Sequence, residues 1–563
     1  MILSFEFQYI SQNGVLENFL KSICEEFEIN YKIDKNETIV TLHVEAVEEK
    51  LGEFADFLSA RLPLSIFFKS STVHVSEEIK SYIDIKDCNL TLPYTPKVLS
   101  MAHDETSIEY MSCFVKNEVG IAPFAESKKI SLFDKEGNLV ADASDSQSYI
   151  EIYANISQKL LSGSKVLIQS SSGDFIYTKV DASTKSISKT CKNIVATDLS
   201  VVEKMAVIRE NEIKALASLE KPSIRLKVNS LFAAKEILDT NRVKIKLADD
   251  MLLQLLCEKL FIDGIEFLYR QEAKTAQYDF VVNVDGRIGH IPQIEVCVLE
   301  NGEIFILSGD GYCASVVKEN LKKFDDIAHA QFTSVIQEHD LFGEQSSCFY
   351  LSKTNNDKII YVSQESGMLD LISFPIMKSI KEVFDTIKES TTGKKMLESY
   401  EKQYPEIYKK ALETQIPTDA PNNIYTMWGI CAVILGISDS VEEGSEQIIE
   451  NAEDYGGQKG PRIDYPLITP ETLISNFNFI KMIRSAMSFK VAGTDDRTLS
   501  FGFIESLAYF LSDQADYYKE NLQSSRMVLC GSLFGIRRLS ELACRNIKAS
   551  SKLAFNRELP IDN

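Results

Sequence analysis

The chain has 563 residues, 44% hydrophobic and 25% charged, so it can build several globular cores. Its 60 lysine and arginine residues stand against 82 aspartate and glutamate residues, and the net charge of −22 predicts no nucleic-acid partner. The 11 cysteines are scattered and form no C-x-x-C pair, which excludes a disulfide framework and indicates a reducing, cytoplasmic compartment.

The first 77 residues alternate between strand-like and helical patterns. Apolar residues at helical spacing occupy 16–27 and 48–62, and strand-like runs occupy 2–9, 31–33, 39–44 and 66–75. This βαββαβ order is that of the ferredoxin-like fold. The N-terminus carries Glu6 and no basic region, which predicts a strand start and no signal peptide.

Residues 78–148 are less regular, and Pro93, Pro96 and a polar run at 142–148 mark loops. Helices and strands alternate again from 149 to 290, which indicates a second α/β unit. Its expected strands lie at 166–169, 175–180 and 223–228.

The last segment, 291–563, begins with a candidate hairpin, because Asn301-Gly302 separates two apolar runs. The remainder is mainly helical, with one further strand expected at 526–530. The longest apolar run, 424–437, is too short to cross a bilayer, which needs about 20 helical residues. We therefore expect a buried core helix there and no membrane insertion.

The loop at residues 11–19 reads S-Q-N-G-V-L-E-N-F and resembles the Q-G-V-x-F-R stretch of acylphosphatases. Their chemistry needs an arginine to hold phosphate, but no arginine precedes Arg61. Glu17 places a negative charge where a phosphate would lie. The sequence therefore predicts a ferredoxin-like domain without acylphosphatase activity.

Between 78 and 148, a zinc site would have only Cys88, His103 and Cys113 as ligands. Zinc in proteins normally takes four converging ligands, usually from closely spaced pairs. These three residues are widely spaced, so no metal site is expected.

The second α/β unit resembles the YrdC-type nucleotide-binding domain. Gly173 follows a strand as the family's glycine loop does, and Lys185, Lys189 and Lys192 fall where the family has a basic stretch. The resemblance implies that these lysines hold the phosphates of ATP and of an acyl phosphate. Because Ala248-Asp-Asp replaces the family's Pro-Tyr-Thr-Pro element, a solvated lysine face is the alternative.

The last segment resembles the kinase-like ATPase (ASKHA) domain that shares its fold with actin and sugar kinases. His329 matches the middle histidine of an H-H-H-A-H motif, but Ile327 and Gln331 replace the two metal-binding histidines. Asp562 matches the metal-ligand aspartate of the same family. Without its partner histidines, Asp562 is not expected to hold a metal conventionally.

Two further elements carry this resemblance. Glu443 and Gly444 match the family's Y-E-G-Q-A-A element, and Gly531 and Ser532 match the start of its S-G-G-V-F-Q-N turn. The resemblance implies that Gly531 and Ser532 contribute to nucleotide binding. Only the first glycine of that turn is kept, and its asparagine is not.

The order of these segments is similar to that of the HypF-type hydrogenase maturation carbamoyltransferases, and the chain resembles a divergent member of that family, near its shorter HydE-type accessory proteins of epsilon-class proteobacteria. The resemblance implies an acylphosphatase-like domain (1–77), a degenerate linker (78–148), a YrdC-like domain (149–290) and a kinase-like ATPase domain (291–563). The family converts carbamoyl phosphate and ATP into carbamoyl adenylate. It then passes the carbamoyl group to a partner's C-terminal cysteine.

Most apolar motif positions persist, whereas most polar catalytic positions are lost. The leading hypothesis is therefore an accessory protein with eroded catalytic sites that binds a hydrogenase subunit or maturation factor. A second hypothesis keeps ATP and carbamoyl-phosphate adenylation in the YrdC-like domain, with ATP as cofactor and Lys189 and Lys192 lining a pocket. A third is an unrelated α/β assembly, which would lack the ferredoxin-like first domain.

Overall fold

The computed structural model describes residues 1–36, 38–77, 90, 92, 129–143, 146–182, 192–275, 277–285, 290–309, 312–313, 315–469, 471–548 and 551–561. The chain forms two compact units. Unit 1 contains Met1–Val298 and Ser308–Ala314, and unit 2 contains Leu299–Leu307 and Ser315–Asn563. Within the described residues, no helix is both long and apolar enough to span a membrane.

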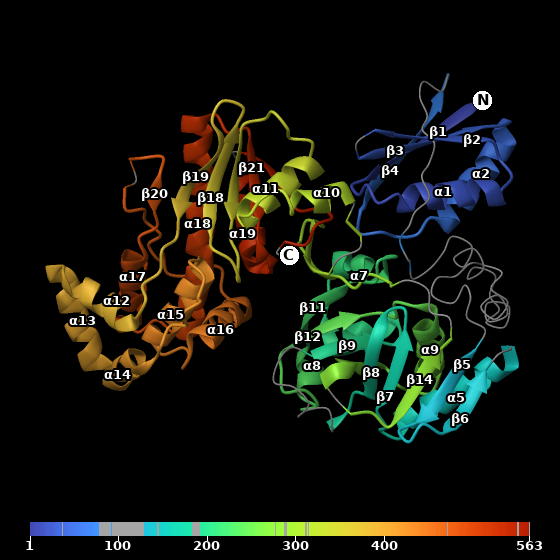
Figure 1. The fold of residues 1–563 in the computed structure, drawn as a ribbon, viewed down its shortest axis with the longest axis horizontal. Helices are drawn as coiled ribbons and strands as arrows, with labels where there is room; N and C mark the ends of the chain where they lie inside the picture. Colours follow the sequence, from blue (N-terminus) through green and yellow to red (C-terminus); the bar gives the residue numbers. More distant parts are fainter. Residues whose placement is uncertain are drawn as a thin grey trace. The chain divides into compact units, whose positions relative to one another are not determined.

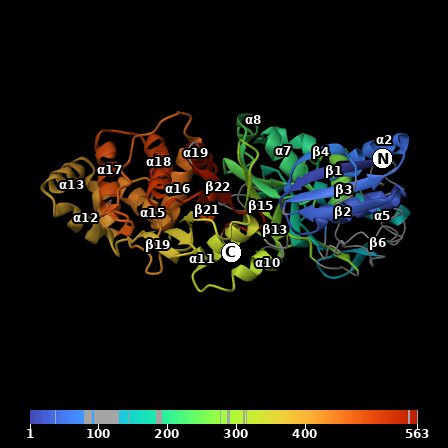
Figure 2. The ribbon, with the colours of Figure 1, turned by 90° about the horizontal axis from the view of Figure 1, so that it is seen from above.

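Unit 1 begins with a four-stranded antiparallel sheet that carries two helices on one face (Figure 1). Its elements are β1 (Ile2–Tyr9), α1 (Val15–Glu26), β2 (Tyr31–Asn36), β3 (Ile39–Glu45), α2 (Glu48–Arg61) and β4 (Phe68–Ser76). The strand order is β2-β3-β1-β4, and Figure 2 shows the same sheet from above. The expected βαββαβ order is confirmed, because Phe19, Leu42 and Phe54 are buried as their spacing requires.

The rest of unit 1 is built on a large mixed sheet. Its strands are β5 (Ile130–Asp134), β6 (Leu139–Ala143), β7 (Val166–Ser170), β8 (Gly173–Lys179), β9 (Lys192–Ala196), β10 (Ala206–Val207), β11 (Ser223–Val228), β12 (Arg242–Lys246), β13 (Phe267–Glu272), β14 (Phe280–Val284) and β15 (Glu295–Val298). The order is β15-β11-β12-β9-β13-β8-β7-β14-β5-β6, and β10 pairs with β11.

The helices of this part are α5 (Ser146–Leu161), α6 (Val202–Met205), α7 (Glu210–Ala217), α8 (Ser230–Ala233) and α9 (Met251–Ile262), with short 3-10 turns η2 (Leu199–Val201) and η3 (Ala273–Thr275). Helix α9 is apolar on nearly all sides, and Leu252, Leu256 and Leu260 are fully buried. A helix of this kind forms part of a core. The polar residues that precede it are therefore drawn into the interior as well.

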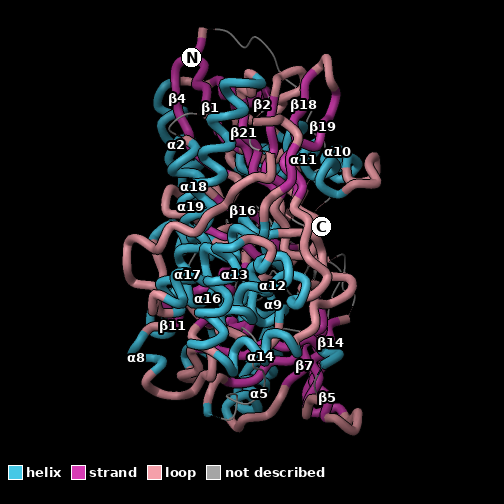
Figure 3. The backbone as a smooth tube through the Cα atoms, turned by 90° about the vertical axis from the view of Figure 1, so that its left-hand side faces the viewer, coloured by secondary structure: helices cyan, strands magenta, loops and turns pink. Residues whose placement is uncertain are grey.

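Unit 2 combines a six-stranded sheet with a group of helices (Figure 3). The six strands are β17 (Ser346–Tyr350), β18 (Lys358–Ser363), β19 (Gly367–Ser373), β20 (Ser475–Asn476), β21 (Arg526–Cys530) and β22 (Lys552–Phe555). Most of a further strand, β16 (Ile304–Ser308), also falls in unit 2 but is not part of this sheet. The sheet order is β20-β19-β18-β17-β21-β22.

The helices are α10 (Ser315–Asn320), α11 (Ile327–Glu338), α12 (Ile380–Lys388), α13 (Thr391–Gln403), α14 (Pro405–Glu413), α15 (Ile424–Leu435), α16 (Val441–Asp454), α17 (Phe479–Val491), α18 (Asp496–Leu522) and α19 (Arg537–Ile547), with the 3-10 turn η4 (Ser532–Gly535). The apolar run at 424–437 forms the buried helix α15, as expected. Its Trp428 is fully buried and donates Nε1–H to Tyr465 Oη at 2.8 Å.

Helix α11 is followed by a partly buried histidine, His339, whose contribution to stability depends on pH. His339 Nε2 lies 2.8 Å from Phe555 O, so the neutral ring can donate this hydrogen bond. Burial, followed by the charge of Arg557, lowers the pKa of His339 to about 4. The unfolded chain has an ordinary histidine pKa near ~6.5. Below that pH the unfolded chain gains a proton that the native state does not, so this stabilisation is lost as pH falls toward 4.

We expect the His339→Gln variant to lose less stability on acidification than the wild type. Glutamine keeps a donor and cannot titrate, so the difference should approach ~1.4 kcal/mol per pH unit between about 6.5 and 4. Urea unfolding across this pH range measures it, with His74→Gln at an exposed position as control. Parallel pH profiles for the wild type and His339→Gln would contradict the assignment.

Candidate functional site

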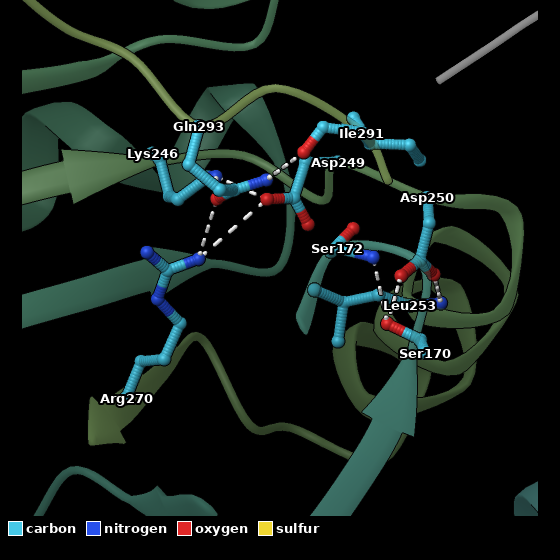
Figure 4. A network of polar contacts seen from close by, with 9 residues as sticks. All are labelled: Ser170, Ser172, Lys246, Asp249, Asp250, Leu253, Arg270, Ile291 and Gln293. Atoms are coloured by element: carbon cyan, nitrogen blue, oxygen red, sulfur yellow. Dashed lines mark hydrogen bonds and ion pairs between the residues drawn. The ribbon is translucent and has the colours of Figure 1, made fainter. Parts of the chain in front are cut away.

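A cluster of buried polar side chains lies where β12, β13 and the start of α9 meet in unit 1 (Figure 4). Lys246 ends β12, Asp249 and Asp250 precede α9, Arg270 lies on β13, and Gln293 lies before β15. Lys246 is 4% exposed, and Asp249 and Asp250 are 1% exposed each. These charges are therefore cut off from bulk water.

Lys246 and Arg270 converge on the same two acceptors. Lys246 Nζ donates to Asp249 Oδ2 and, at 2.6 Å, to Gln293 Oε1. Arg270 Nη1 donates to Gln293 Oε1 at 3.1 Å and lies 3.5 Å from Asp249 Oδ2. Gln293 Nε2 in turn donates to Ile291 O at 3.4 Å. The amide oxygen of Gln293 thus bridges the two cations.

Asp250 joins this cluster to the turn between β7 and β8. Its carboxylate accepts from Ser170 Oγ at 2.5 Å and from the Leu253 backbone N–H at 2.8 Å, so it also caps α9. Ser170 Oγ accepts from the Ser172 N–H at 3.2 Å. Asp250 therefore has a structural role.

The pKa shifts follow from burial and from the pairing. Burial lowers the pKa of Lys246 to about 8, against the opposing effect of Asp249. Burial raises the pKa of Asp249, but the charges of Lys246 and Arg270 more than offset this and hold it below its usual range. Burial and then the charge of Asp249 raise the pKa of Asp250. Lys246 and Asp249 consequently form an ion pair at neutral pH.

The two cations of the cluster, Lys246 and Arg270, are matched by the two acids, Asp249 and Asp250, and both cations already have acceptors. Phosphate binding needs cations with free donor capacity. A phosphate that took over these donors would break the buried pairs, which would leave an uncompensated buried charge. Asp249 Oδ1 has no hydrogen-bond partner among the described residues, so the cluster can accept one more donor.

Of the nucleotide-binding residues predicted in unit 1, the structure describes Gly173 and Lys192, and these two lie on strands that are not neighbours. Lys192 begins β9, its side chain is fully buried, and its Nζ lies 3.1 Å from Asp239 Oδ1. Gly173 begins β8, after the two-residue turn from Ser170. Strand β13 lies between β8 and β9. Lys185 and Lys189 fall outside the described residues.

The loop that resembles an acylphosphatase site contains an internal ion pair. Glu17 is buried in the first turn of α1, and Lys35 Nζ lies 2.5 Å from Glu17 Oε1. Lys35 Nζ also donates to Ser11 O at 3.1 Å. The local cation is thus bound to a carboxylate and a loop carbonyl.

In unit 2, Gly531 and Ser532 form a tight turn after β21. Gly531 has φ of 96°, and a Cβ atom there would lie 2.1 Å from Leu351 O, so only glycine fits. Ser532 Oγ accepts from the Lys353 N–H at 2.8 Å. Lys353 Nζ pairs with Glu446 Oε1 at 2.8 Å. The hydroxyl and the nearest cation both have partners within unit 2.

His329 also has a carboxylate partner. Its Nε2 lies 2.7 Å from Asp370 Oδ1, and Lys358 Nζ joins Asp370 and Asp326 at 2.6 and 2.7 Å. Among the described residues, no group of three or more histidine, cysteine, aspartate or glutamate side chains could hold a metal. Asp562 lies outside the described residues.

Glu443 and Gly444 lie in the first turn of α16. The Glu443 side chain is exposed, and its N–H donates to the capping Ser440 Oγ at 3.2 Å. Gly444 packs against Gly429 and Ala432 of α15. The contacts of Gly444 are thus between helices.

No sequence pattern marks Lys246, Arg270 or Gln293 as site residues. A signal exists for Asp249 and Asp250, because they directly precede a helix that is apolar on almost every face. Arg270 and Gln293 are distant in the chain, and no local pattern connects them to Lys246.

Comparisons with known proteins agree over nearly the whole chain, although no family model matches. The chain is 24% identical over 531 residues to Protein HydE of Wolinella succinogenes, covering 91% of this chain and 90% of HydE. It shares its fold with full-length HypF in a phosphate- and nucleotide-bound form (TM-score 0.61). It also shares it with HypF of T. kodakarensis (TM-score 0.67). Both structures are 12% identical, and each comparison covers 100% of this chain and 96% of the other.

Proposed function

Since the chain is a HypF-type hydrogenase maturation family member with HydE as a homologue, we propose that it is an accessory protein in the maturation of nickel–iron hydrogenase. The observation that carries this proposal is the likeness to HydE, which extends along 91% of the chain. The partner we propose is a hydrogenase subunit or another maturation factor, in the cytoplasm.

We propose the same four segments as in the sequence analysis: acylphosphatase-like (1–77), linker (78–148), YrdC-like (149–290) and kinase-like ATPase (291–563). The βαββαβ order of the first segment supports its assignment. Strands β5 and β6 lie within 78–148 and extend the sheet of the third segment through β14. The second and third segments therefore share one sheet.

An accessory role without full carbamoyl transfer is supported by the pairing of the candidate cations. Lys246 and Arg270 share Asp249, and Lys192 pairs with Asp239. Phosphoryl and acyl transfer depend on charges that are free to stabilise the transition state. We infer that these side chains now stabilise the fold and leave the family's chemistry to other proteins.

The first test is pyrophosphate release and AMP formation by the purified protein with ATP, with and without carbamoyl phosphate. We expect no turnover above a protein-free control, with circular dichroism showing that the protein is folded. Turnover that depends on carbamoyl phosphate would instead establish adenylation in the YrdC-like segment, and the accessory proposal would be wrong.

A genetic test addresses the hydrogenase role itself. Deleting the gene in its host should lower nickel–iron hydrogenase activity, and the wild-type gene should restore it. The Lys246→Met/Asp249→Leu variant, which removes the central ion pair, should restore it equally if the cluster only supports the fold. Unchanged hydrogenase activity after deletion would refute the role, and failure of a folded variant to complement would indicate that the cluster has a chemical function.

A further inference from the structure

A pocket of about 810 Å³ opens in unit 2 beside α18 and α19, which lie next to each other (Figures 1 and 3). Phe501, Glu505 and Tyr509 line it from α18, at the i, i+4, i+8 spacing of one helix face. Its four cations are Lys459 in the loop after α16 and Arg538, Arg545 and Lys548 on or directly after α19. We call this pocket the α18–α19 groove.

Among the described residues, none of the four cations of the groove has an acidic side chain within ion-pair distance. Within the part of the chain that the structure describes, none of their side chains makes an ion pair or a hydrogen bond. The Arg538 guanidinium lies over the Phe501 ring, with Cζ 5.1 Å from its centroid, and its Nε is buried without a partner. In a chain of net charge −22, unpaired cations gathered in one pocket favour an anionic ligand.

The groove also contains three glutamates, Glu300, Glu505 and Glu541, and each of them has a partner of its own. Glu505 Oε2 accepts from the Gly460 N–H at 2.9 Å, and Glu541 Oε1 lies 3.8 Å from Arg537 Nε. These carboxylates would repel a compact polyphosphate more strongly than a peptide, whose singly charged carboxylates are spaced along the chain. Phe501 is only 1% exposed, but the Tyr509 ring is 40% exposed and offers a contact for an apolar side chain of such a peptide.

A second pocket continues the basic surface. It has a volume of about 470 Å³, shares Lys548 with the groove and adds Lys519, Arg526 and Lys552, together with Glu344, which pairs with Arg526 at 2.9 Å. From Arg538 to Lys548 the backbone advances ~15 Å, the length of about five residues of extended chain. Two adjoining pockets with a common lysine fit an elongated ligand better than a compact one.

We propose that the α18–α19 groove binds an extended acidic segment of a partner polypeptide, with carboxylates on Arg538 and Arg545 and an apolar side chain against Tyr509. Arginine pairs carboxylates through two parallel N–H groups, so these residues would supply most of the affinity. The proposal deepens the proposed function, on which it rests for the existence of a protein partner. The binding itself can be measured without hydrogenase.

The probe is a fluorescein-labelled peptide of about eight residues, long enough for both pockets, that alternates aspartate and leucine. We expect anisotropy titration to show saturable binding that weakens as salt increases. The Arg538→Gln/Arg545→Gln variant should raise the Kd at least ~10-fold, equivalent to the loss of about 1.4 kcal/mol. The control Lys394→Gln/Lys395→Gln removes the same charge from exposed positions on α13 and should leave the Kd unchanged.

Because Arg538 contacts Phe501, the exposed Arg545→Gln change is also tested alone and should raise the Kd about 3-fold in a fully folded protein. The proposal is overturned if the wild type does not bind the peptide, or if a peptide with asparagine in place of aspartate binds equally well. It is also overturned if pyrophosphate or ATP displaces the peptide at lower concentration, which would identify a small-phosphate site. If the peptide does not bind but deletion lowers hydrogenase activity, only the groove proposal fails. If the peptide binds but deletion has no effect, only the proposed hydrogenase role fails.

Discussion

The Asp249→Asn variant should lower the free energy of unfolding by about 3–5 kcal/mol, whereas Lys246→Met/Asp249→Leu should cost less than Asp249→Asn alone. After the single change, the buried cations Lys246 and Arg270 no longer have a carboxylate at position 249 as their shared acceptor. The double change removes one charge of each sign and fills the space with apolar side chains. Arg270 keeps its bond to Gln293 Oε1 at 3.1 Å.

Urea unfolding followed by circular dichroism measures both variants, and hydrogen exchange of β12 and α9 localises the effect. Glu295→Gln on β15 of the same sheet is a matched control, because Lys244 and Glu295 form a pair at 2.6 Å that is partly exposed. It should cost under about 1 kcal/mol. The single variants Lys246→Met and Asp249→Leu are measured as well; if the double variant lost as much stability as these two added together, Lys246 and Asp249 would not be coupled.

Gly309→Ala should destabilise unit 1 by at least about 3 kcal/mol and disturb the same cluster. Gly309 has φ of 91°, and a Cβ atom there would lie 1.8 Å from Gln293 O. The backbone that places the Gln293 amide between Lys246 and Arg270 would have to move. We therefore expect faster hydrogen exchange at β12 and β15 together with the lower unfolding free energy.

The Gly163→Ala variant is a control that measures the effect of backbone strain without a steric clash. Gly163 also has a positive φ, 86°, but a Cβ atom there meets nothing within 4 Å. It should cost only the strain of a left-handed residue, about 1–2 kcal/mol. If the Gly163→Ala and Gly309→Ala variants lowered the free energy of unfolding equally, the clash with Gln293 would not contribute to the destabilisation.

The elements that depend on local pattern could be predicted from the sequence. The βαββαβ order follows from apolar residues at spacings of two or three to four, and these signals lie within each element. The strand β21 has the bounds expected for it, Arg526–Cys530, because an apolar run meets a glycine at Gly531. The apolar run at 424–437 predicts a buried helix, and α15 is buried.

The candidate site could not be predicted in the same way. Lys192 stands at the start of an apolar strand, where a lysine usually faces solvent, and its burial depends on Asp239 in a distant loop. The Lys246 cluster is assembled by the strand order of a mixed sheet, which no local signal encodes. The family resemblance indicates that residues of the catalytic motifs are replaced. It does not indicate the ion pairs that the structure has at the candidate positions.

The chain crosses between the two units three times, after Val298, after Leu307 and after Ala314. Residues 299–307 supply unit 2 with Ile306 O, which accepts from the Ile561 N–H at 2.9 Å. Residues 308–314 return to unit 1, where the Tyr312 ring packs 6.3 Å from the Phe67 ring. A single recombination breakpoint anywhere in this stretch would strip an inner piece from one unit or the other. The two units are therefore not exchangeable by a single crossover in this stretch.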